Sequence, residues 1–163
     1  MAFLLDSNVL IEAKNRYYAF DICPGFWDWL SDEHDGEQVL SIKAVRDEVV
    51  SRADELAAWV AARSSSFFLT PDQADLVPLA TLATWVNSQK YRPAAVAEFL
   101  QSADYYLIAS AMAHKHIIVT HETPSDAIKR VKIPEPCIAH NVECINPFTM
   151  LRRLGVRFVR EGT

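Results

Sequence analysis

Four acidic residues have types and positions that could do chemistry together: Asp6, Glu48, Asp104 and Glu122. Clustered carboxylates repel one another and take up protons unless a cation compensates their charge. Mg²⁺ typically takes one or two carboxylates plus water molecules as ligands. A cation held in this way activates a water molecule and neutralises a phosphate. If the fold brings these acids together, they predict a divalent metal site suited to hydrolysis.

Each of the four acids also has an ordinary interpretation when it is taken alone. Asp6 and Asp104 each stand where a helix begins, and an aspartate there often only caps the helix. Glu48 has the position of a solvated helix residue, and Glu122 that of a turn acid. Their order along the chain, and the elements around them, therefore carry more weight than any one of them.

Short apolar runs precede these acids and predict the strands that position them. Ala2 to Leu5 ends directly before Asp6, and Ile117 to Thr120 ends just before Glu122. Apolar residues at helical spacing follow most of these runs. Strands that alternate with helices predict an α/β domain with a largely parallel sheet. Ligands of such sheets lie at the carboxyl ends of the strands. The other expected strands are 38–42, 67–69, 137–139, 142–145 and 156–159.

Length and composition predict one globular domain over residues 1–163. Half of the 163 residues are hydrophobic, which is enough for a sizeable core. No apolar run approaches the roughly 18 residues of a membrane span. The first residues lack a basic region and reach an acid at Asp6, so no secretory signal is expected and the expected location is the cytoplasm.

The charge balance excludes one class of function. Sixteen basic against 21 acidic residues give a net charge of −5. Binding to nucleic acid through bulk electrostatics is not expected for such a chain. If the protein handles a phosphodiester, a local feature must overcome the repulsion, and a bound divalent cation is the simplest one.

The order of these motifs resembles the PIN-domain nucleases, the fold of the VapC-like toxins, over about residues 2 to 125. The matching segments are FLLDSNVL (3–10), SIKAVRDEV (41–49), ADYYLIASA (103–111) and IVTHE (118–122). The tail, from Ile133 through the stretch 137–146, resembles the DUF4411 type of PIN-like bacterial proteins. The resemblance implies a three-layer α/β/α domain with a central, mainly parallel sheet.

The resemblance also implies roles for particular residues. Asp6 and Asp104 fall on positions that hold Mg²⁺ or Mn²⁺, and Glu48 on one that binds the metal or a water. The adjacent Asp47 would point about 100° away from Glu48 on a helix. Glu122 stands where the family usually has an aspartate, and its extra methylene leaves open whether it binds a second metal directly, through water or not at all. Two polar residues match positions that orient water or phosphate, with helix capping and strand-end hydrogen bonding as equal alternatives: Asn8 and Thr120.

Metal-dependent endoribonuclease activity is the function that the resemblance implies. The family usually acts as the toxin of a toxin–antitoxin pair, so RNA and a cognate antitoxin are the expected partners, and a homodimer is expected by analogy. Two alternatives remain at this stage. One is a catalytically altered PIN-like binding module. The other is a phosphatase of the haloacid dehalogenase type, which would need a second aspartate where Asn8 stands.

Cysteine and histidine residues outside these motifs allow a second metal hypothesis. Cys137, His140 and Cys144 have a spacing that zinc could use, although two buried thiols and a surface histidine are the favoured interpretation, because no second CxxC-like half exists. Three cysteines cannot all pair within one chain, so reduced thiols are expected. His114 and His116 flank the expected end of a helix, where a favourable interaction with the helix dipole explains them.

Overall fold

A five-stranded sheet, all parallel, forms the centre of the computed structural model, which describes residues 1–162. The strand order is β3-β2-β1-β4-β5. The predicted α/β class with a parallel sheet is therefore confirmed. The strands are β1 (Phe3–Leu5), β2 (Val39–Ile42), β3 (Phe68–Leu69), β4 (Ile117–Val119) and β5 (Cys144–Ile145).

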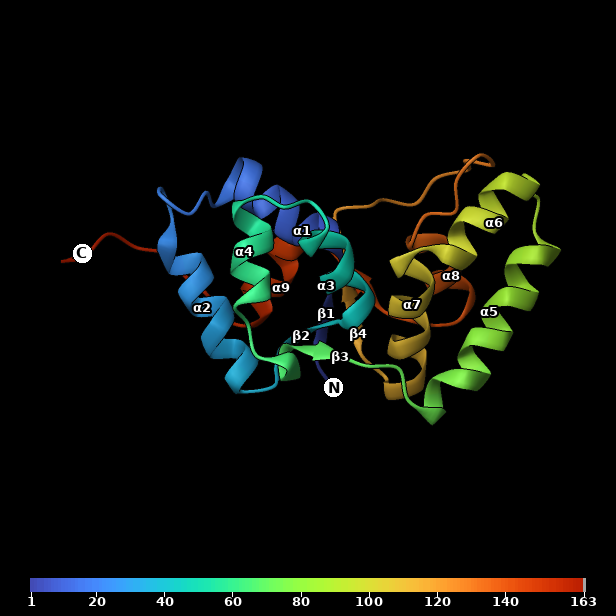
Figure 1. Ribbon diagram of the computed structural model, residues 1–163, viewed down its shortest axis with the longest axis horizontal. Coiled ribbons are helices and arrows are strands. Elements are labelled where there is room, and N and C mark those ends of the chain that lie inside the picture. The colour runs from blue at the N-terminus through green and yellow to red at the C-terminus, as the bar shows by residue number, and fades with distance from the viewer. Residues whose placement is uncertain (163) are drawn as a thin grey trace.

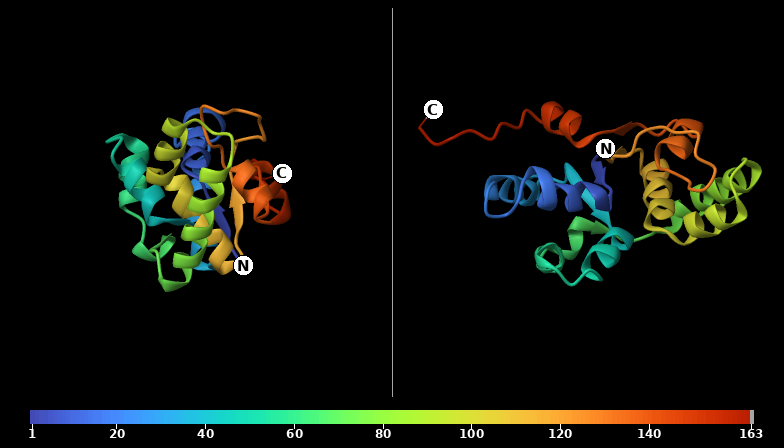
Figure 2. Two further views of the ribbon diagram at one scale, coloured as in Figure 1. Left: turned by 90° about the vertical axis from the view of Figure 1, so that its right-hand side faces the viewer. Right: turned by 90° about the horizontal axis from the view of Figure 1, so that it is seen from above.

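Helices cover both faces of the sheet and give a three-layer α/β/α arrangement. Figure 1 shows the strands between one group made of α1, α2, α4 and α9 and another made of α5 to α8. The right-hand view in Figure 2 shows the C-terminal segment leaving α9 and running toward the end of the molecule where α2 lies. Within residues 1–162, no helix has the length and apolar character needed to cross a membrane. The α-helices are α1 (Ser7–Glu12), α2 (Pro24–Asp35), α3 (Lys43–Val50), α4 (Glu55–Ala61), α5 (Leu76–Ser88), α6 (Pro93–Gln101), α7 (Ala103–His114), α8 (Pro134–Ala139) and α9 (Pro147–Arg153).

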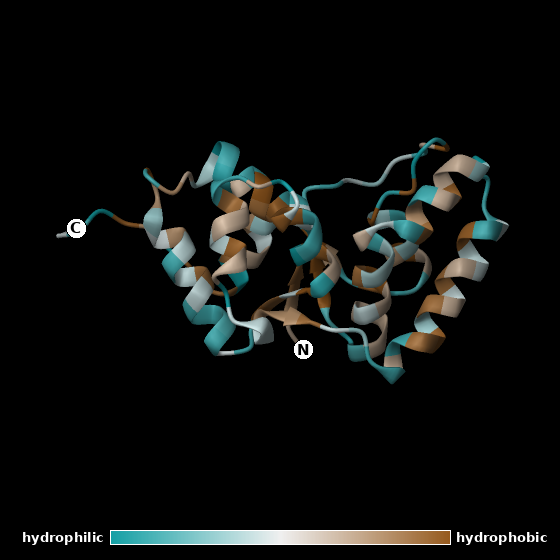
Figure 3. Ribbon diagram, in the orientation of Figure 1, coloured by the Kyte–Doolittle hydropathy of each residue, from teal (hydrophilic) through white to brown (hydrophobic). Residues whose placement is uncertain are grey.

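The core lies along the central strands because helices exclude water from both of their faces. Leu4 and Leu5 of β1 and Ile118 of β4 are fully buried. Figure 3 shows the hydrophobic colours gathered on these strands in the middle of the molecule. Strands buried on both faces are expected to read as continuous apolar runs. This is the pattern that made β1 and β4 predictable from the sequence.

The strand order creates a switch point between β1 and β4. From β1 the chain continues to β2 and β3 on one side, and it later returns to β4 on the other side of β1. Helices that leave neighbouring strands in opposite directions open a crevice at their carboxyl ends, where ligands of such sheets bind. Asp6 directly follows β1, and Thr120 directly follows β4. The segment from β4 to α8 passes over this edge, at the top of Figure 1.

One predicted extended segment, Cys137 to Ala139, is helical instead. It belongs to α8, which starts at Pro134. Prolines argue against a helix interior because they lack an N–H group, but Pro134 and Pro136 both lie in the first turn, where that group has no partner within the helix. The prediction of a strand at 137–139 was therefore wrong.

The last predicted strand, 156–159, is also absent from the described part of the chain. Gly155 has a φ of +67°, and the chain turns there directly after α9. Beyond that turn, Phe158 packs its ring near those of Tyr18 and Phe26 rather than beside a strand. An alternating pattern without a neighbouring strand to pair with does not form a sheet.

Candidate metal-binding active site

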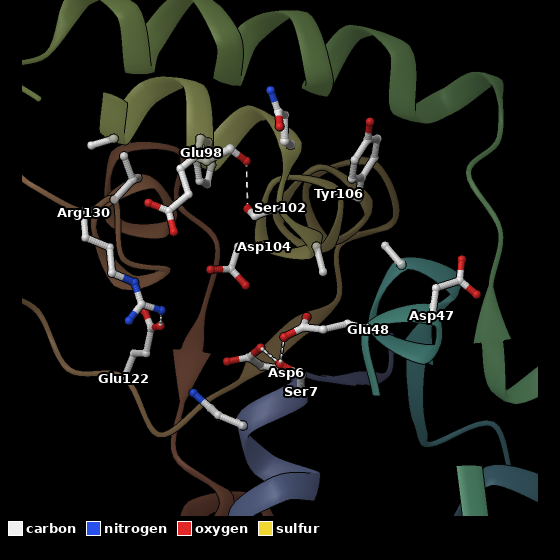
Figure 4. Close-up of a pocket in the computed structure, with 17 residues that line it drawn as sticks. Asp6, Ser7, Asp47, Glu48, Glu98, Ser102, Asp104, Tyr106, Glu122 and Arg130 are labelled. Atoms are coloured by element: carbon white, nitrogen blue, oxygen red, sulfur yellow. Dashed lines mark hydrogen bonds and ion pairs between the residues drawn. The ribbon is translucent and has the colours of Figure 1, made fainter. Parts of the chain in front are cut away.

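A cavity of about 540 Å³ opens at the carboxyl ends of the central strands. Its walls come from α1 and α3 on one side and from α6 and α7 on the other, with the segment after β4 closing one end. Figure 4 shows Asp6, Glu48 and Asp104 directed toward a common space. Among residues 1–162, one basic residue, Arg130, lines the cavity together with six carboxylates: Asp6, Asp47, Glu48, Glu98, Asp104 and Glu122.

Asp6 is buried at the base of the cavity, with a 3% exposed fraction. It occupies the position before α1, yet its side chain makes no capping hydrogen bond. Instead, one carboxylate oxygen, Oδ2, accepts a hydrogen bond of 2.8 Å from Thr120. Burial raises the pKa of Asp6 to about 6; Glu122 and Glu48 add to this effect, whereas the Thr120 hydroxyl opposes it. Its carboxylate therefore carries a negative charge for which the protein provides little compensation.

Asp104 lies at the start of α7, partly buried against the same space. The chain breaks at Ser102, which ends α6 and precedes α7, and this break turns the start of α7 toward the cavity. Asp104 is the second residue of the helix and not its cap, and within residues 1–162 its carboxylate has no hydrogen-bond partner. Burial raises the pKa of Asp104 to about 8, with further increases from Asp6, Glu122 and Glu48 and a decrease from Arg130.

Glu48 reaches the cavity from α3 and is linked to Asp6 through a serine. The Ser7 hydroxyl lies 3.2 Å from Oε1 of Glu48 and 3.4 Å from Oδ1 of Asp6. Asp47 points away from this pair, as the helical spacing predicts, because its carboxylate binds Lys43 at 2.7 Å. The α3 carboxylate that is available to a ligand is therefore that of Glu48.

Thr120 connects the two strands at the switch point through one hydroxyl group. Its Oγ1 donates to Asp6 and accepts hydrogen bonds from Asn8 Nδ2 at 3.0 Å and from the Glu122 N–H at 3.1 Å. The other amide atom of Asn8, Oδ1, accepts from the His121 N–H at 3.1 Å. Asn8 and Thr120 thus hold the acids in position, in agreement with the hydrogen-bonding role that the sequence allowed.

Replacing Thr120 with valine is expected to destabilise the protein by about 1–3 kcal/mol, because the change leaves two partly buried donors and a buried carboxylate without their partner. The melting temperature should fall by roughly 3–10 °C. Thermal unfolding followed by circular dichroism measures this. Thr81→Val is the matched control, since its hydroxyl bonds only to a carbonyl of its own exposed helix. Equal melting temperatures of the two variants would contradict the assigned role.

Glu122 is engaged differently from the other acids. Its Oε1 accepts a hydrogen bond from Arg130 at 2.9 Å, and its Oε2 accepts one from the Ile133 N–H at 2.8 Å. The additional methylene, relative to an aspartate, lets the carboxylate reach across the segment between β4 and α8. Glu122 therefore anchors this segment, while its charge still raises the pKa values of Asp6 and Asp104.

Three cavity residues were missed by the sequence reasoning: Ser7, Glu98 and Arg130. Ser7 adjoins Asp6, so its position next to a strand-end acid was a usable signal. Glu98 lies on α6 and Arg130 in the segment after β4, and both reach the cavity only through the tertiary fold. No local pattern marks either of them.

The carboxylates of the cavity lie farther apart than side chains that all bind one metal ion directly. Among the described residues, a group with ligand atoms all within 4.8 Å of one another is found elsewhere, formed by Asp72, Asp75 and His114, and this group could hold a metal ion. The ligand atoms of Cys137, His140 and Cys144 do not form a group of this kind, so the geometry does not support the hypothesis of a zinc site at these residues. His140 instead binds the Pro136 carbonyl and lies against Trp85, whereas the three cysteines are free thiols.

Fold and site together define an α/β protein with a carboxylate-lined cavity at the switch point of a parallel sheet. The chain matches the family described as a domain of unknown function, DUF4411, over residues 3–158, and it belongs to that family. No curated protein and no solved structure matches it. The match extends through α8 and β5, so the resemblance of the tail to the DUF4411 family is confirmed.

Proposed function

We propose that the protein is a metal-dependent endoribonuclease with a PIN-like site. The observation that carries this proposal is the convergence of Asp6, Glu48 and Asp104, from three separate elements, on one cavity at the switch point. Two of these acids have raised pKa values, of about 6 and about 8. Perturbed acids of this kind, gathered in a cleft, are typical of functional sites.

The donor set fits Mg²⁺ or Mn²⁺ because it consists of oxygen ligands with excess negative charge. Asp6 and Asp104 would hold the ion, and Glu48 would bind it or one of its water molecules. The wide spacing of these carboxylates suits Mg²⁺, which keeps several waters in its coordination shell. When bound, such an ion lowers the pKa of a water molecule and neutralises phosphate charge.

The protein's own groups would then handle the proton and orient the substrate. As the oxygen of the attacking water bonds to phosphorus, a carboxylate of the cavity accepts a proton from that water. The bond from phosphorus to the 3′-oxygen breaks, and that oxygen takes up a proton, which gives a 5′-phosphate and a 3′-hydroxyl. Asn8 and Thr120 keep Asp6 aligned, and Arg130 offers its remaining N–H groups to a phosphate oxygen.

Asn8 argues against a phosphatase of the haloacid dehalogenase type. Such an enzyme needs an acid at this position, whereas both polar atoms of the Asn8 amide are used in hydrogen bonds to Thr120 and His121. A catalytically altered binding module remains the second candidate. The observation that favours it is that both oxygens of Glu122 are already engaged.

The biological role that we propose is that of a toxin controlled by an antitoxin protein. It rests on the resemblance of the four acidic motifs to VapC-like toxins. The net charge of −5 makes tight binding to generic RNA unfavourable. A specific or structured RNA is therefore the proposed substrate, rather than RNA in bulk.

Cleavage of a mixed RNA pool tests the proposal directly. We expect cleavage with Mn²⁺ or Mg²⁺ and none with EDTA, and no cleavage by an Asp6→Asn variant that is purified identically. The variant controls for trace nuclease contamination. Equal activity of both proteins would refute the assignment of the site. Metal binding by calorimetry without any cleavage would favour the binding module instead.

A further inference from the structure

A second cluster of metal-ligating side chains lies away from the proposed active site. Asp72 and Asp75 flank the short turn before α5, and His114 is the last residue of α7. Their ligand atoms all lie within 4.8 Å of one another. Asp104 lies ten residues earlier on the same helix, which corresponds to roughly 15 Å along its axis. The two sites are therefore separate in space.

Asp75 supplies the observation that points to a ligand. This residue has a 4% exposed fraction, and its Oδ1 has no hydrogen-bond partner. Its other oxygen, Oδ2, accepts from the Asp72 N–H at 2.8 Å, which fixes the orientation of the carboxylate. A buried carboxylate oxygen without a partner is costly. The unpartnered oxygen is the one that lies 3.7 Å from Nε2 of His114.

The distances fit a tetrahedral zinc ion better than they fit direct hydrogen bonds. Nε2 of His114 lies 3.3 Å from Oδ2 of Asp72 and 3.7 Å from Oδ1 of Asp75. Two ligands at the usual zinc distances of about 2.0–2.1 Å are separated by roughly 3.3 Å when their angle at the metal is tetrahedral. One imidazole and two carboxylates are also ligands that zinc uses.

The surroundings of His114 support a fixed site. The ring of His116 stacks on that of His114 with centroids 5.8 Å apart, and its Nδ1 accepts a hydrogen bond from the Ala2 N–H. The side chain of His114 is 33% exposed, so an ion can reach Nε2 from solvent and keep a water as its fourth ligand.

We propose that Asp72, Asp75 and His114 form a binding site for a divalent transition-metal ion of the zinc class. A bound ion would join the turn before α5 to the end of α7, two segments that are distant in the sequence. It would thereby stabilise the helix that carries Asp104 at its other end. This inference does not depend on the nuclease proposal.

Zinc titration of the full chain in an Asp104→Asn background tests the site, because that background weakens the proposed catalytic site. Calorimetry should show one tight site for Zn²⁺, and saturating Zn²⁺ should raise the melting temperature by on the order of 5 °C. Adding His114→Ala should weaken the affinity by at least about 100-fold. Adding Asp75→Asn should do the same, while its amide oxygen can still accept the capping hydrogen bond.

Two further variants separate this site from the other zinc ligands of the chain. His140→Ala removes a partly buried histidine outside the cluster, and Cys144→Ser removes a thiol. Both should keep the affinity of the background for Zn²⁺. Absence of tight binding in the background, loss of binding in Cys144→Ser, or full affinity in His114→Ala would each overturn the proposal. RNA cleavage by the wild type is read separately, so failure of one proposal does not imply failure of the other.

Discussion

Replacing Asp104 with asparagine is expected to abolish metal-dependent RNA cleavage while making the metal-free protein more stable. The loss should be about 1000-fold or more, since a metal site contributes several kcal/mol to the stabilisation of the transition state. Asparagine has nearly the same shape as aspartate but no charge. It therefore removes a metal ligand without opening a cavity.

The gain in stability follows from the electrostatics of the empty cavity. Asp104 is partly buried, lacks a hydrogen-bond partner and is repelled by Asp6, Glu48 and Glu122. At pH 8, in EDTA, the variant should be more stable by on the order of 2 kcal/mol, after allowance for the partial exposure of the side chain. Its melting temperature should rise by roughly 4–8 °C. Denaturant unfolding and RNA cleavage, measured on the same preparation, check both effects.

Asp28→Asn is the matched control for this prediction. Asp28 is an exposed acid on α2, outside the residues that line the cavity. Its removal makes the same chemical change, from a carboxyl to an amide group, and it should change the free energy of unfolding by no more than about 0.5 kcal/mol. A merely structural Asp104 would give a different result, with stability and activity falling together. An Asp104→Asn variant that remains fully active would exclude Asp104 as a ligand.

The sequence predicted those parts of the site that local patterns define. Asp6 and Thr120 end buried apolar strands, and parallel strands bring their carboxyl ends to one edge, so the proximity of these residues followed from the class of fold. Asp104 and Glu48 were predicted by resemblance and helical spacing. The cavity contains all four predicted acids, whereas their distances could not be anticipated.

The remaining parts of the site depend on contacts that no local pattern encodes. Glu98 reaches the cavity because α6 ends at Gln101 and the chain turns at Ser102. The engagement of Glu122 depends on Arg130 and Ile133, which follow it by eight and eleven residues in an irregular segment. The strand expected at 137–139 is part of α8 instead, and the prolines of this helix are tolerated because they lie in its first turn.

Stability of the metal-free protein is expected to fall as the pH rises from about 5 to about 8.5. In the folded protein the pKa of Asp6 is about 6 and that of Asp104 about 8, both above the ordinary value of 3.8. Between the unfolded and the folded pKa values, the folded state therefore binds more protons than the unfolded state. Stability decreases with pH wherever this holds. The stabilisation that each carboxyl group contributes is fully present at pH values below its unfolded pKa. It is lost as the pH rises through the folded pKa of that group.

A divalent ion should remove this dependence, because it compensates the ionised carboxylates in place of protons. In EDTA, the free energy of unfolding should drop by on the order of 2 kcal/mol across this pH range, allowing for the partial exposure of Asp104. With saturating Mg²⁺ or Mn²⁺ the drop should disappear, and it should be smaller in Asp104→Asn without metal. Urea unfolding at several pH values measures all three. A stability in EDTA that stays constant or rises would show that the protein itself compensates these charges, and the electrostatic argument for a metal would then fail.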